Sequence, residues 1–307
     1  TPLPPEIPAG QNPPDGALLD YYLASAPAGE ITVGIYDGAG KLVREFSSAA
    51  LPAQQGAPPF VATYWLAHPE PLATAPGMHR FAWDLRYPDP QYIVGQSPYN
   101  YPIAAIAGAT PAVPQGAMVL PGKYEVRLTA GGRTSRQPLE VTMDPRVTWT
   151  RDALERQLRL ELEISDALGR NFAAHQQVKA LRARLAELAK RPKGDAVAAA
   201  AEALDKKVGG LEGEATEILV TPDKADFMAL NDAFTSLIQL VDGADLAPTA
   251  SQQAAFQQTC QKLNAALAQW QEIKDKDGSA LATLLQQQKL AALPELPETK
   301  ADAACGK

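Results

Sequence analysis

The stretch PGKYEVRLTAGGR, residues 121–133, decides the fold. Pro-Gly is a turn signal at its start, Tyr124, Val126 and Leu128 alternate on one face, and Gly131-Gly132 turns the chain back towards residues 134–143. This pattern predicts a β-hairpin with one buried face. The residues before it predict further short strands, and the residues after Pro145 predict helices.

Four earlier stretches show the two-residue alternation of strands, namely residues 16–24, 31–36, 41–46 and 78–86. In the first of them, Leu18, Asp20 and Tyr22 fall on one face and Leu19, Tyr21 and Leu23 on the other. With the hairpin, about seven short strands separated by turn signals predict an antiparallel β-sandwich of immunoglobulin or fibronectin-III type over residues 15–146. We expect Trp83 and Tyr124 to pack between its sheets.

Two long arms interrupt this pattern: residues 47–69 contain no charged residue, and residues 87–122 contain one, Asp89, together with seven prolines. Prolines at this density prevent a central strand or a helix. The arms either pack on their own sandwich or on the helices, or they form a docking surface, which a stiff, uncharged and aromatic segment suits. The residues predicted for that interaction surface are Tyr64, Trp65, Tyr87, Tyr92, Tyr99 and Tyr101.

Apolar residues recur at steps of three and four from Thr150 to Lys190, which predicts one long amphipathic helix. Further helices are predicted from Ala196 to about Leu211, from an N-cap at Thr221, and after Thr249, the last with a kink or break at Asp277-Gly278. Short links between long helices favour an antiparallel bundle of three to four helices over residues 147–293. A proline-rich linker, 1–14, and a flexible tail, 294–307, complete the predicted organisation.

Charge and composition argue against several classes of partner. The net charge is −7, with 9 Lys+Arg and 12 Asp+Glu up to Arg146 and 19 and 23 after it, so neither half is basic. Nucleic acid and anionic membranes are therefore not expected partners. No apolar run approaches the ~20 residues of a spanning helix. The two cysteines, Cys260 and Cys305, are too few for a disulfide framework or a zinc site, and two unpaired thiols are favoured over one bridge from tail to bundle.

The sequence shows no catalytic constellation. It lacks a nucleophile elbow, a P-loop and a dinucleotide fingerprint, and no metal-binding spacing links its histidines, which are His68, His79 and His175. A carboxylate pair beside tryptophan would be a glycosidase-like mixture, and its candidates are Glu70, Asp84 and Asp89 with Trp65 and Trp83. Asp84 falls on an ordinary strand pattern, which argues against this carboxylate pair. Together with the absence of the motifs above, this leads us to predict no catalytic residue, no cofactor and no metal.

Three stretches carry a resemblance to a known family: ITVGIYDGAGKLVREF (31–46), GMHRFAWDLRYP (77–88) and LPGKYEVRLTAGGRTSRQPLEVTMDPRV (120–147). With the helical region after them, they resemble the C-terminal portion of bacterial exported proteins with sortilin-like β-propellers, which are labelled as BNR-repeat or glycosyl-hydrolase-type proteins. The resemblance runs from residue 14 to about residue 294 and is weaker in the helices. The propeller would precede this portion, and no Asp-box repeat occurs in this sequence, so a glycosidase label is not carried over.

The resemblance implies a periplasmic or secreted bacterial module, and a start at Thr1 without a leader fits a processed form or an excised piece. We expect a non-catalytic accessory module that makes protein–protein or interdomain contacts, with an upstream β-propeller or another protein as partner. The alternative is a carbohydrate-binding accessory module whose exposed tyrosines and tryptophans stack on a glycan. A hydrolase with its site in the arms is the third hypothesis.

Overall fold

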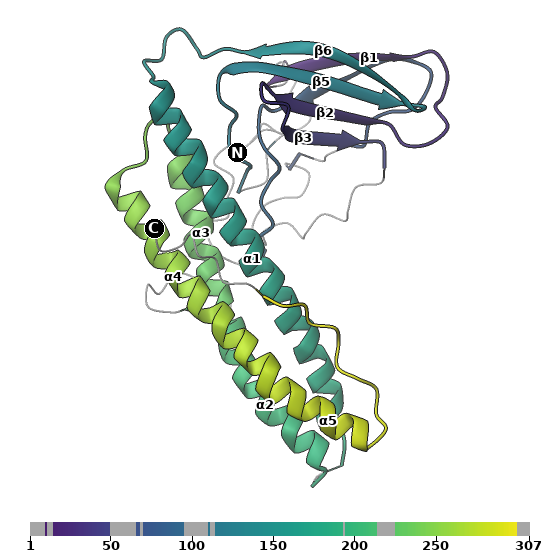
Figure 1. Cartoon of the computed structure of the whole chain (residues 1–307), viewed down its shortest axis with the longest axis vertical. Coiled ribbons are helices and arrows are strands. Elements are labelled where there is room, and N and C mark those ends of the chain that lie inside the picture. The colour runs from purple at the N-terminus through teal and green to yellow at the C-terminus, as the bar shows by residue number, and fades with distance from the viewer. Residues whose placement is uncertain are drawn as a thin grey trace. The chain divides into compact units, whose positions relative to one another are not determined.

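The structure is a computed structural model, and it describes residues 10, 15–49, 66–67, 70–94, 110, 114–192, 194–213 and 225–299. Six strands come first and the helices follow, as the sequence predicts (Figure 1). The elements are β1 (Ala17–Leu23), β2 (Thr32–Asp37), β3 (Leu42–Ser47), β4 (Gly77–Trp83), β5 (Gly122–Ala130), β6 (Arg133–Val141), α1 (Arg151–Ala189), α2 (Ala196–Glu212), α3 (Phe227–Asp242), α4 (Ala250–Ile273), the π-helical turn η3 (Lys274–Gly278) and α5 (Ser279–Gln287).

By its internal contacts the chain divides into two compact units. Unit 1 comprises Thr1–Asp89, Tyr101–Leu162 and Asp242–Pro248, and unit 2 comprises Pro90–Asn100, Glu163–Val241 and Thr249–Lys307. The chain passes from one unit to the other within the second predicted arm, at Asp89–Pro90, and again within α1. The division into domains between residues 146 and 147 stays a prediction, because the two units are divided at other residues, such as Leu162 and Glu163 within α1.

The strands form two antiparallel sheets, one of β1 and β4 and one in the order β3-β2-β5-β6. The described residues contain six strands, where the sequence predicts about seven. Strand β4 was predicted to reach Arg86 but ends at Trp83, because Leu85 adopts a φ of 60° that breaks the extended conformation.

One hydrophobic cluster takes residues from both sheets. Tyr21, Leu23 and Trp83 of the two-stranded sheet lie in the same core as Val33 and Ile35 of β2. Tyr124 is half-buried, and its ring meets Trp83 edge to face at a centroid distance of 5.9 Å. These contacts confirm the prediction that Trp83 and Tyr124 pack in the core. Burial of such large rings is a main source of stability.

The β5–β6 hairpin turns at Gly131 and Gly132, which have φ values of 54° and 74°. Two successive positive φ values define a type I′ turn, the geometry that matches strand twist. Because Ala130 and Arg133 form the closing pair, the backbone groups of Thr134, Arg136, Pro138 and Glu140 point to the free edge of β6.

Three helix starts agree with the sequence. Thr150 Oγ1 accepts the backbone N–H of Ala153 at 3.3 Å, Asp195 caps α2, and Thr249 forms a capping box with Gln252. The predicted start at Thr221 lies outside the described residues, and α3 begins at Phe227.

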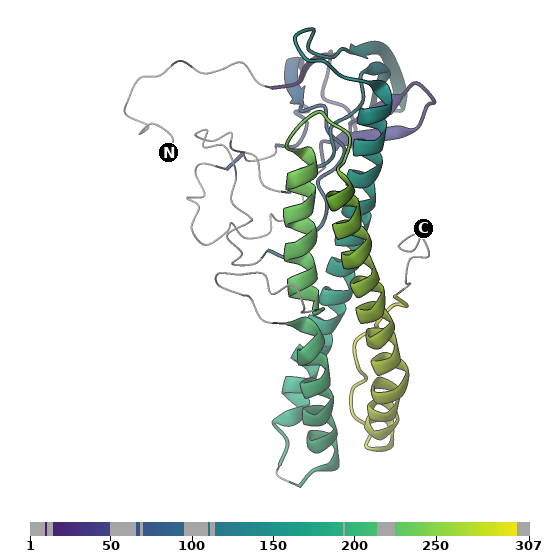
Figure 2. The same ribbon diagram turned by 90° about the vertical axis from the view of Figure 1, so that its left-hand side faces the viewer.

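Two helix ends differ from expectation. Helix α2 continues through Gly209 and Gly210 to Glu212, because helical geometry tolerates glycine at a cost of about 1 kcal/mol each. The predicted break at Asp277-Gly278 is a π-helical turn that leads from α4 into α5 (Figure 1). Within unit 2, α2 lies beside α4 and α5 (Figure 2).

The segment predicted as a flexible tail, 294–307, makes hydrogen bonds over its described part. Lys274 Nζ donates to the Pro297 carbonyl at 2.5 Å, and the Thr299 N–H donates to Gln271 at 3.2 Å. Cys260 is disulfide-bonded and only 1% exposed, so the preference for unpaired thiols is wrong for this residue. The sequence has one other cysteine, Cys305, which lies outside the described residues.

Candidate functional site

The structure describes two of the six residues predicted for an interaction surface, Tyr87 and Tyr92, and both are partly buried. The other four, Tyr64, Trp65, Tyr99 and Tyr101, lie outside the described residues. The described portions of both arms touch each other, since Leu66 and Thr110 form a parallel bridge in which the Ala67 N–H donates to the Thr110 carbonyl at 2.7 Å.

The two ends of the second arm pair with each other and close its base. Arg86 and Met118 form an antiparallel bridge, in which the Tyr87 N–H donates to the Ala117 carbonyl and the Val119 N–H to the Leu85 carbonyl, both at 2.9 Å. A Cβ atom at Gly116 would lie 2.0 Å from the Tyr87 carbonyl oxygen. Only glycine permits this close approach.

Polar side chains fix the same base. Arg44 donates to the Tyr87 carbonyl at 2.8 Å, and Asp89 accepts the Gly116 N–H at 2.8 Å. Burial raises the pKa of Asp89. The base of this arm is therefore anchored by backbone pairing and by the hydrogen bond to the Asp89 carboxylate. A proline-rich segment needs such contacts because its prolines cannot donate.

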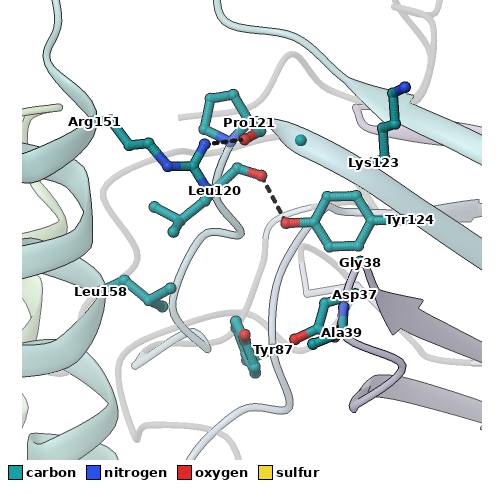
Figure 3. A pocket seen from close by; sticks show the side chains of 11 residues that line it. Asp37, Gly38, Ala39, Tyr87, Leu120, Pro121, Lys123, Tyr124, Arg151 and Leu158 are labelled. Atoms are coloured by element: carbon teal, nitrogen blue, oxygen red, sulfur yellow. Dashed lines mark hydrogen bonds between the residues drawn. The ribbon is translucent and has the colours of Figure 1, made fainter.

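Tyr87 also lines a cavity of about 380 Å³ within unit 1 (Figure 3). The β2–β3 turn, the start of β5 and the first turns of α1 enclose it. Its lining residues are Asp37, Gly38, Ala39, Tyr87, Leu120, Pro121, Gly122, Lys123, Tyr124, Arg151 and Leu158.

The polar groups of this cavity are largely engaged. The Tyr124 hydroxyl donates to the Leu120 carbonyl at 2.6 Å, and the Arg151 guanidinium contacts the Pro121 carbonyl at 3.5 Å (Figure 3). Asp37 Oδ1 accepts the N–H groups of Ala39 and Lys41, both at 2.9 Å. Burial, together with the charges of Tyr87 and Asp37, raises the pKa of Tyr124 to about 12.

The tyrosines therefore stay protonated at neutral pH, and burial also raises the pKa of Tyr87. Protonated phenols beside a guanidinium and a carboxylate can hydrogen-bond and stack on a ligand. This arrangement suits recognition better than proton transfer, because a general base should titrate near the working pH.

Within unit 2, a buried side chain of α3 binds the backbone of the second arm at Ile93. The Asn231 side chain on α3 accepts the Ile93 N–H at 2.7 Å and donates to the Ile93 carbonyl at 2.9 Å. One amide thus satisfies both backbone groups of a residue, as a neighbouring strand would. Asn231 is fully buried, and its position among the apolar residues Phe227, Leu230 and Phe234 is the sequence signal that could have identified this contact.

A buried carboxylate lies on α1 within unit 1. Glu161 is 1% exposed and accepts the Gln157 side-chain N–H at 3.0 Å. The charges of Asp242 and Arg86, which form an ion pair at 3.0 Å, also act on this carboxylate. Burial and the negative charge of Asp242 raise the pKa of Glu161 to about 7. The sequence periodicity gave no indication of this, because glutamate in a long helix usually faces water.

The residues considered for chemistry are mostly engaged elsewhere. Asp84 Oδ1 accepts the Arg86 N–H at 3.1 Å, and Glu70 is exposed. His79 contacts the Ala75 carbonyl, and burial lowers the pKa of His175. His68 lies outside the described residues. Among the residues whose positions are given, no group of three or more His, Cys, Asp or Glu side chains could hold a metal ion.

Comparisons with known proteins add no family: no family model, no curated protein and no solved structure matches this chain. No helix in the described part of the chain is long and apolar enough to cross a membrane.

Proposed function

We propose that this chain is a non-catalytic accessory module of an exported bacterial protein, and that it makes contacts with an upstream sortilin-like β-propeller or with another protein. In this proposal, unit 1 contains an immunoglobulin- or fibronectin-III-like sandwich and the helices form an antiparallel bundle. The single hydrophobic cluster shared by the two antiparallel sheets supports the sandwich.

The observation that carries the proposal is how the described ends of the second arm, residues 87–94 and 114–122, are held by backbone hydrogen bonds. Its base is closed by the Arg86–Met118 bridge, and Asn231 binds both backbone groups of Ile93. A stiff segment that is already held in one conformation loses little entropy when a partner packs against it. The partly buried rings of Tyr87 and Tyr92 fit a scaffolding role rather than a row of open stacking platforms.

An exported location is part of the same proposal. Disulfides form and persist in oxidising compartments, such as the bacterial periplasm, and are rare in the cytosol. The disulfide at the buried Cys260 supports this location.

The test compares this chain with the full-length natural polypeptide by amide hydrogen exchange. We expect residues 85–94 and 114–120 to exchange more slowly when the upstream part is present. The amides of α2 serve as an internal reference and should keep their rates. Equal rates at the arm in both samples would contradict the proposal.

A second candidate is carbohydrate binding, which the Tyr87–Tyr124 cavity favours. A pyranose ring could stack on Tyr87 while Arg151 and Asp37 bind its hydroxyl groups. Calorimetric titration with mono- and oligosaccharides should then show binding that Tyr87→Ala abolishes. The matched control is Tyr22→Ala, an exposed tyrosine outside the cavity, which should leave binding unchanged. Absence of binding to the unaltered chain would reject this candidate.

A further inference from the structure

The outward face of the two-stranded β1–β4 sheet is rich in apolar side chains. Eight large hydrophobic residues are exposed in the described part of the chain, and three of them lie on this small face: Leu18 at 45%, Tyr22 at 63% and Met78 at 68% exposed. Single exposed apolar residues are ordinary, but three of them on one small face indicate an interaction surface.

The face consists of three cross-strand pairs in register. Leu18 lies opposite Ala82, Asp20 opposite Arg80, and Tyr22 opposite Met78. Two apolar pairs therefore flank a bidentate ion pair, in which Arg80 Nε and Nη2 donate to the Asp20 carboxylate at 2.7 and 2.9 Å. The ion pair itself is largely exposed, so it contributes little to the stability of a single chain.

We propose that this face binds a second copy of the same chain through a two-fold axis that runs along the ribbon between β1 and β4. Such an axis stacks two sheets face to face and places β1 of one copy over β4 of the other at the same height. Each residue then meets the copy of its own cross-strand partner. Asp20 faces Arg80 of the second copy, and Tyr22 faces the second Met78.

Complementarity to itself is what selects this occupant. Acid meets base in the central row and apolar meets apolar in both outer rows, so no like charges oppose each other. A perpendicular axis in the same plane would instead place Asp20 over Asp20, which is repulsive. Six residues per copy bury far less than the ~800 Å² per partner of a stable dimer, so the association is weak.

The experiment is sedimentation equilibrium of the whole chain between about 10 μM and 1 mM. The average mass should rise from that of the 32.7 kDa monomer towards twice that value over this range. Met78→Lys should hold the mass at the monomer value, because it places a charged side chain in an outer apolar row, opposite Tyr22 of the second copy. The matched control is Leu240→Lys, equally exposed at 68% but on α3, and it should associate like the unaltered chain.

Charge reversal tests the central row separately. Asp20→Arg should weaken association at least tenfold, and adding Arg80→Asp should restore it. Thermal unfolding of each variant verifies that the fold is retained. A constant monomer mass up to 1 mM, or association that Met78→Lys does not change, would overturn the proposal; the first outcome would leave this face to a different protein.

Discussion

At the scale of single residues, Glu161 makes the stability of the protein depend on pH. Its pKa is raised from 4.5 to about 7 in the folded chain, so the unfolded state loses the proton first as pH rises. Stability from this group is fully present below pH 4.5, falls between pH 4.5 and 7, and stays lost above pH 7.

Glu161→Gln should remove that loss. We expect the free energy of unfolding to increase by up to about 3 kcal/mol at pH 8 and to change little at pH 4, as measured by urea denaturation at both values. Glu163→Gln, on the exposed face of the same helix, is the control and should leave the pH dependence unaltered. A variant that is equally stabilised at both pH values would show that the carboxylate does not titrate as inferred.

Gly116 is the second residue with a sharp prediction. Gly116→Ala places a methyl group 2.0 Å from the Tyr87 carbonyl oxygen and should cost about 2 kcal/mol or more, because backbone must move at the base of the arm. Gly122→Ala meets no atom within 4 Å and is the matched control, with a much smaller expected loss. Denaturation midpoints of both variants decide this, and equal losses would contradict the close-approach explanation.

Residue patterns predicted the alternation of faces but not the groups that meet across the chain. Tyr22 and Tyr21 fall on opposite faces as expected, because a strand has a period of two. The cavity instead joins Asp37, Tyr124 and Arg151 from the end of β2, from β5 and from α1. No spacing rule links three such elements, since only tertiary packing brings them together.

At the scale of elements, the β5–β6 hairpin depends on its turn. Both turn residues have positive φ, which Asn accepts at the first position and β-branched residues do not. Gly131→Asn should therefore keep stability within about 0.5 kcal/mol, whereas Gly131→Val should lose at least about 1 kcal/mol. Thermal unfolding of the two variants checks this, and indifference to valine would mean that the turn is not type I′ in solution.

Elements with strong local signals were predicted well and those decided by long-range contacts were not. The capped starts at Asp195 and Thr249 were placed to within a residue, because the cap is a local hydrogen bond. The end of β4 was missed, since the positive φ of Leu85 accompanies the pairing of Arg86 with Met118 far along the chain. The end of α2 differs from the prediction because paired glycines are a typical stop signal, whereas this helix continues through them to Glu212.

At the scale of the whole molecule, the disulfide at Cys260 allows a test of the exported location proposed above. In denaturant without reductant, a thiol reagent should not modify Cys260. After reduction of the disulfide, the reagent should modify this residue. Mass spectrometry of the labelled peptide makes the measurement, with Cys260→Ser as control. Labelling of Cys260 before reduction in protein purified from the periplasm would contradict both the disulfide and the export argument.

The free edge of β6 has a consequence for assembly. Pro138 lies at an outward-facing position and lacks the N–H that an added strand would require, and Arg136 points its backbone to the same edge. A foreign strand that aligned there would meet a gap in its ladder at mid-length. Fibre-like growth from this edge is thereby discouraged, even at high protein concentration. At this edge, recognition of a neighbouring molecule would use side chains rather than an added strand.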